Sequence, residues 1–101
     1  MQLLTDEIKS ILPALYSTED IPCEEKQIVC KFFNPMGAGT WLIAEGEEQA
    51  TGDWLFFGYC DLGLGTPEWG YVSLSELESV KLPLGLGIER DIYFSAQTIS
   101  L

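Results

Sequence analysis

Apolar and polar residues alternate along five segments of the chain, and this period of two predicts five β-strands. The segments are residues 27–33, 40–45, 53–60, 68–72 and 88–94. In the fourth segment, Trp69 and Tyr71 fall on one face of the strand. Short stretches rich in turn-forming residues separate the first four segments, and such short connections indicate an antiparallel meander.

Two further segments show the apolar spacing of helices. Thr5 is a good N-cap for a short helix that Pro13 ends. Residues 73–76 read Ser-Leu-Ser-Glu, a capping box that predicts a second helix to about residue 80. We expect both helices to cover one face of the sheet. The predicted fold class is therefore α+β, an antiparallel sheet of about five strands with two short helices, in a single domain of residues 1–101.

The charge balance excludes several classes of function. The 101 residues include 5 Lys and Arg, 16 Asp and Glu and no His, which gives a formal net charge of −11. So acidic a chain does not hold nucleic acid through counterion release, nor an anionic membrane through charge. Without histidine, Ser-His-Asp catalysis and His-ligated metal sites are excluded. No signal peptide or membrane-spanning run is recognisable, so we expect a cytoplasmic protein.

The cysteines indicate neither a metal site nor a disulfide framework. Cys23, Cys30 and Cys60 lack the close paired spacing of zinc or redox motifs, and their number is odd. We expect Cys30 and Cys60 to be small core residues of the strands. The sequence predicts no metal and no cofactor.

Several blocks of sequence together resemble a known family. They include Leu3-Leu4-Thr5, Lys31-Phe32-Phe33, Thr40-Trp41, Phe56-Phe57-Gly58-Tyr59, Gly70-Tyr71, the run from Ser73 to Glu78, and Ile88-Glu89-Arg90-Asp91. Their order and spacing are similar to those of the small acidic bacterial proteins catalogued as domain of unknown function 2958. The resemblance implies a bacterial protein of a plasmid, integrative element or phage. It implies no activity and transfers no catalytic residue.

Carboxylates and large aromatic residues form the leading candidate surface. Acidic residues group in the loops, and aromatic residues are frequent anchors of protein interfaces. We therefore expect a non-enzymatic protein that docks on a basic protein partner, and in the sharper form of this hypothesis a DNA mimic that inhibits a nucleic-acid-binding host complex. The alternative for the acidic surface is solubility alone. The candidate partner-binding residues are Glu45, Glu47, Glu48, Asp53, Trp41, Trp69 and Tyr71.

A second cluster combines both signs of charge around the only arginine. Arg90 falls on the apolar side of its predicted strand, where a guanidinium needs carboxylate or carbonyl partners. We expect a structural fork to Glu45, Asp53 or Glu68; the alternative is a small-ligand or metal-binding, hydrolytic site at which these carboxylates converge. A third possibility is self-association through a sheet edge, and the oligomeric state stays open. The cluster comprises Glu89, Arg90, Asp91 and Glu68.

Overall fold

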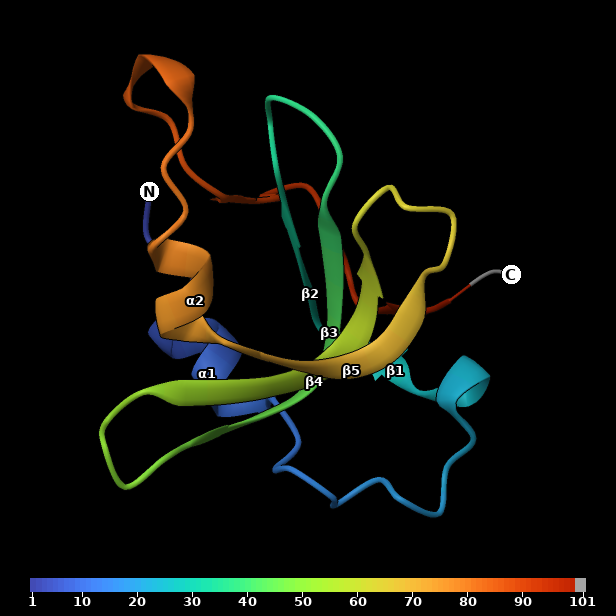
Figure 1. The fold of residues 1–101 in the computed structure, drawn as a ribbon. Helices are drawn as coiled ribbons and strands as arrows, with labels where there is room; N and C mark the ends of the chain where they lie inside the picture. Colours follow the sequence, from blue (N-terminus) through green and yellow to red (C-terminus); the bar gives the residue numbers. More distant parts are fainter. Residues whose placement is uncertain (100–101) are drawn as a thin grey trace.

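A five-stranded antiparallel sheet with two short helices forms the body of the molecule (Figure 1). The structure is a computed structural model and describes residues 1–99. The large sheet has the strand order β5-β4-β3-β2-β6, and β1 and β7 form a separate two-stranded ribbon. The predicted α+β class is confirmed. The elements are α1 (Asp6–Ile11), the 3₁₀ turn η1 (Cys23–Glu25), β1 (Gln27–Ile28), β2 (Cys30–Phe33), β3 (Thr40–Glu48), β4 (Trp54–Asp61), β5 (Glu68–Ser73), α2 (Leu74–Glu78), the 3₁₀ turn η2 (Pro83–Gly85), β6 (Glu89–Arg90) and β7 (Gln97–Thr98).

Both helices begin at the predicted caps. The Thr5 hydroxyl accepts a hydrogen bond from the backbone N–H of Ile8 at 3.2 Å. At α2, the Ser73 hydroxyl accepts from the N–H of Glu76, and the Glu76 carboxylate accepts from the N–H of Ser73, each at 3.1 Å. These bonds satisfy backbone donors that the first turn of a helix leaves free.

The core lies between the helices and one face of the sheet, which we call the helix face. Ile8 of α1 and Leu77 of α2 pack with side chains from β2, β3 and β4, and the Phe32 and Phe56 rings lie 5.7 Å apart between their centroids. The expectation that both helices cover the same face is confirmed. The buried core cluster comprises Leu3, Leu4, Ile8, Cys30, Phe32, Ile43, Phe56, Val72, Leu77 and Ile88.

Two predicted strands are shorter than their sequence pattern suggested. The segment 27–33 divides at Val29, so that β1 pairs with β7 while β2 pairs with β3 and β6. The segment 88–94 keeps strand pairing only at residues 89–90. The Asp91 carboxylate accepts a hydrogen bond from the N–H of Tyr93 at 2.9 Å, and the Asp91 carbonyl accepts from the N–H of Phe94. This local turn replaces the continued strand, because an Asp side chain competes for backbone donors.

A β-bulge in β3 decides which side chains face the helices. Ile43 pairs with Gly58 and Glu45 pairs with Phe57, so Ala44 is an extra residue without a partner. Beyond the bulge the alternation of faces is shifted by one position. Glu45, which simple alternation places with Ile43 on the helix face, therefore lies with Phe57 on the opposite face, which we call the open face.

Candidate functional site

A continuous row of aromatic rings crosses the open face. Cross-strand pairing of β4 and β5 sets Tyr59 opposite Trp69 and Phe57 opposite Tyr71. The ring centroids are 5.5 Å apart for Tyr59 and Trp69, 5.6 Å for Trp69 and Phe57, and 5.1 Å for Phe57 and Tyr71. Tyr16 extends the row at 6.3 Å from Tyr71. We call these five residues the aromatic row; Tyr71 and Tyr16 are its most exposed members, at 51% and 58%.

A buried ion pair holds the loop that presents Tyr16. The Glu45 carboxylate accepts hydrogen bonds from the backbone N–H groups of Tyr16 at 2.9 Å and Thr18 at 3.3 Å, and from the Thr18 hydroxyl. Its second partner is Lys26, whose Nζ lies 3.7 Å away and also donates to Thr18. Glu45 and Lys26 are only 3% and 5% exposed. The expectation that Glu45 belongs to an acidic surface is wrong, because the bulge turns it toward this loop.

Tyr16 adopts a backbone conformation that bulky residues avoid. Its φ is +67°, in the left-handed region. Such a conformation costs on the order of 1–3 kcal/mol and persists only where the surroundings enforce it. Here the Glu45 hydrogen bonds enforce it, and the result is the ring contact between Tyr16 and Tyr71. Hydrogen bonding to Tyr16, followed by burial and the nearby groups Tyr16, Glu45 and Glu19, raises the pKa of Tyr71 above its ordinary value.

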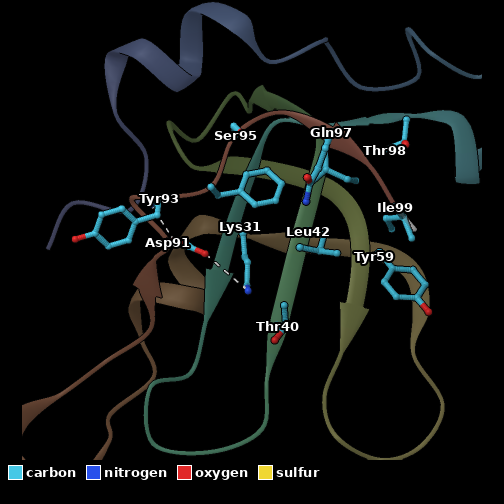
Figure 2. A pocket seen from close by; sticks show the side chains of 12 residues that line it. Lys31, Thr40, Leu42, Tyr59, Asp91, Tyr93, Ser95, Gln97, Thr98 and Ile99 are labelled. Atoms are coloured by element: carbon cyan, nitrogen blue, oxygen red, sulfur yellow. Dashed lines mark hydrogen bonds and ion pairs between the residues drawn. The ribbon is translucent and has the colours of Figure 1, made fainter. Parts of the chain in front are cut away.

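A cavity of about 580 Å³ continues the open face beyond Tyr59 (Figure 2). Lys31, Leu42 and Tyr59 line it from three neighbouring strands, and Gln97 lines it from the C-terminal segment. Lys31 Nζ lies 3.8 Å from a carboxylate oxygen of Asp91, which also lines the cavity. The charges of Lys31 and Asp91 therefore cancel at the cavity end of the open face. At the opposite end, Tyr71 lies near the carboxylates of Glu19 and Glu45.

The other three predicted acidic residues, Glu47, Glu48 and Asp53, differ in their surroundings. Glu47 and Glu48 are exposed at the end of β3. Asp53 instead ties β4 to α2: its carboxylate accepts from the Ser75 hydroxyl at 2.6 Å, the Ser75 N–H at 3.1 Å and the Trp54 N–H at 2.8 Å. These bonds, led by that from the Ser75 hydroxyl, lower the pKa of Asp53.

The structure divides the predicted aromatic patch between the two faces of the sheet. Trp69 and Tyr71 lie together on the open face, but Trp41 packs against the core cluster on the helix face. The register places Trp41 opposite Phe32, which is fully buried. Phe57 and Tyr59 lie beside Trp69 instead, and Tyr16 lies beside Tyr71. The apolar pattern of residues 54–60 gave a signal for Phe57 and Tyr59, whereas Tyr16 lies in a loop that no period describes.

Arg90 lies on the helix face, as predicted, but its expected carboxylate partners are wrong. Its guanidinium donates to the carbonyl of Gln2 and, at 3.3 Å, to that of Leu3. Glu68 is on β5, at the opposite edge of the sheet from Arg90 on β6. Among residues 1–99, no three Cys, Asp or Glu side chains are grouped so that they could hold a metal ion. The alternative in which Glu45, Asp53 and Glu68 converge on one site is wrong, because Glu45 binds the Tyr16 loop, Asp53 binds α2 and Glu68 lies on β5.

Comparison with known protein families identifies the family of this chain. The family model described as "Protein of unknown function (DUF2958)" matches residues 3–100. The chain belongs to the DUF2958 family. The resemblance carried by the sequence blocks is thereby confirmed. No curated protein and no solved structure matches this DUF2958 chain. In the described part of the chain, neither helix has the length and apolar character needed to cross a membrane.

Proposed function

We propose that this DUF2958 protein is a non-enzymatic binding protein that docks its open face on a basic protein partner. The observation that carries the proposal is the aromatic row on a sheet face, in a chain with a net charge of −11. Aromatic side chains are enriched among the residues that contribute most to protein interfaces. Two of the five rings are more than half exposed, so they are available to a partner without unfolding.

Charge indicates the chemistry of this partner. Within residues 1–99 there are three ion pairs, and they engage Asp6, Glu45 and Asp91. Most carboxylates thus have no cation of their own chain, including the exposed Glu47, which the β3–β4 register places on the open face. Lys and Arg side chains of a partner gain both from carboxylates and from the faces of aromatic rings. A basic protein surface therefore complements both the unpaired carboxylates and the exposed aromatic rings.

The sharper form of the proposal is inhibition of a nucleic-acid-binding host complex by a protein of a bacterial mobile element. An acidic surface that occupies a basic groove competes with the phosphates that the groove normally holds. This form of the proposal rests on the expectation from the sequence resemblance that the protein belongs to a plasmid, integrative element or phage. DNA added to the complex should then displace the protein from its partner.

The test is affinity capture from a bacterial host, followed by titration of the captured protein. We expect a basic partner whose affinity falls steeply from low to moderate salt, because screening acts over a Debye length of about 8 Å at physiological ionic strength. The variant Glu47→Lys changes an exposed carboxylate of the open face and should weaken binding more than Glu24→Lys, which makes the same charge change at an exposed residue outside the sheet. Salt-independent affinity, or equal effects of the two variants, would contradict docking of the open face.

A further inference from the structure

Strand β5 is a long outer strand with a free edge. Its residues 68–73 pair with β4 in a regular register, and β5 ends the strand order. The opposite outer strand, β6, has two residues and is held by the Arg90 contacts to the N-terminus. Proteins usually protect outer strands with proline, lysine or a bulge. Residues 68–73 contain neither proline nor lysine, and no strand of residues 1–99 pairs with their outer side.

An apolar groove accompanies this edge on the helix face. It has a volume of about 480 Å³ and is lined by Trp41, Leu62 and Val80, with Glu68 and Glu76 among its polar residues. Gly70 leaves the groove open along β5, because a Cβ added there would meet no atom within 4 Å. The Gly70 backbone is also free of the left-handed conformation that would make a larger side chain strained.

The two sides of the edge differ in chemistry. The register places Trp69 and Tyr71 on the open face and Gly70 and Val72 on the helix face, where they line the groove; Tyr71 also borders it. An extended segment beside β5 would place successive side chains alternately against the aromatic rings and into the groove. Basic side chains suit the rings, and small apolar side chains suit the groove.

We propose that β5 is the docking edge for an extended segment of the basic partner, which joins the sheet as a sixth strand. This inference rests on the proposed function and specifies how the partner is held. Main-chain hydrogen bonds to the free edge supply affinity, and the alternating side chains supply specificity, as in other cases of strand addition. A second copy of the chain is the wrong occupant: it would bring another net charge of −11 and its own Glu68 against the same edge.

The probe is a synthetic peptide that alternates arginine and valine, acetyl-RVRVRVR-amide, with acetyl-EVEVEVE-amide as its matched control. Amide hydrogen exchange is measured by NMR with and without each peptide. We expect the basic peptide to bind and to slow exchange of outward-facing amides of residues 69–72 by about tenfold or more, since opening of a paired strand is required for exchange. We expect the acidic peptide to change nothing.

Two variants locate the binding. Gly70→Val fills the groove and should weaken peptide binding at least tenfold, whereas Gly37→Val serves as its control, because Gly37 is exposed and a Cβ there also meets no atom within 4 Å. If Gly70→Val fails to fold, Glu68→Lys tests the same edge through charge and should weaken binding as well. Equal affinities of the folded edge variant and the control would overturn the inference.

The outcomes separate this inference from the proposed function. Binding of the basic peptide without protection of β5 would overturn strand addition and leave open-face docking intact. Absence of peptide binding would also overturn strand addition, while the salt and charge tests on the captured partner decide the proposed function independently. A dimer in sedimentation experiments with protected β5 amides would assign the edge to a second copy, against the inference.

Discussion

The two faces of the sheet use similar aromatic residues for different ends. On the helix face, Phe32 and Phe56 are completely buried beneath α1 and α2. On the open face, Trp69 and Tyr71 contact neighbouring rings while part of their surface remains exposed. The difference shows that aromatic content alone does not separate core from interface; the assignment depends on which face each strand position occupies. We expect substitutions in the buried core of the helix face to lower stability, and substitutions in the aromatic row of the open face to weaken binding.

The largest effect should come from the helix face. Phe56→Ala removes a fully buried ring between the helices and the sheet. Loss of such a ring creates a cavity and should lower the free energy of unfolding by about 3–5 kcal/mol. Urea denaturation followed by circular dichroism measures it. A loss below about 1 kcal/mol, the size expected of surface changes, would break the distinction between the faces.

Glu45 and Glu47 sharpen the comparison because they lie two residues apart on β3. Glu45→Gln removes the charge that pairs with buried Lys26 and should destabilise the fold by about 3 kcal/mol. Glu47→Gln changes an exposed side chain and should alter stability by about 0.5 kcal/mol or less. Equal effects in denaturant unfolding would show that the loop around Tyr16 and the ion pair with Lys26 do not set Glu45 apart from Glu47.

Arg90 provides a smaller effect on the helix face. Arg90→Ala removes hydrogen bonds to two backbone carbonyls of the N-terminal segment, so we expect a loss of about 2 kcal/mol. Lys81→Ala, an exposed cation, is the control. Thermal or urea unfolding distinguishes this result from the larger loss expected of a broken buried ion pair. If both variants lose the same free energy of unfolding, the hydrogen bonds of Arg90 do not stabilise the fold.

The smallest effect concerns Asp53 and depends on pH. Its pKa is lowered in the fold, mainly by the Ser75 hydroxyl, so its charged form stabilises the folded state above the unfolded pKa of about 3.9. This contribution is lost as the pH falls through the lower folded pKa. Asp53→Asn should therefore be less stable than the wild type at pH 7, and the difference should shrink below about pH 4. A difference that is constant from pH 7 to pH 2.5 would contradict the hydrogen-bonded carboxylate.

Local signals in the sequence predicted local structure well. Thr5 and the Ser73–Glu76 box mark helix starts because their bonds involve residues only three positions apart. The alternation of apolar and polar residues located the strands of the meander, because it too is a pattern among neighbouring positions. It could not locate the change of sheet at Val29, since the apolar pattern continues through that residue while its hydrogen-bond partners change.

The candidate site was harder to predict because it depends on contacts distant in sequence. A single extra residue, Ala44, moves Glu45 to the other face, and no composition rule marks that position. Arg90 bonds to carbonyls 87 and 88 residues away, which only the folded N-terminus brings near. The period of two correctly predicted that Trp69 and Tyr71 share one face. It could not predict the position of Tyr16, because a buried ion pair between distant residues holds its loop.

The most direct test compares two tryptophans that lie on opposite faces, Trp54 and Trp69. Trp54 packs against the core cluster on the helix face, and Trp69 belongs to the aromatic row. The measurement is the free energy of unfolding and the affinity for the captured basic partner, for Trp54→Ala and Trp69→Ala side by side. We expect Trp54→Ala to lose about 3 kcal/mol of stability and to keep its affinity, and Trp69→Ala to lose about 1 kcal/mol and to bind at least tenfold more weakly. Unchanged affinity of a folded Trp69→Ala variant would contradict the role of the open face.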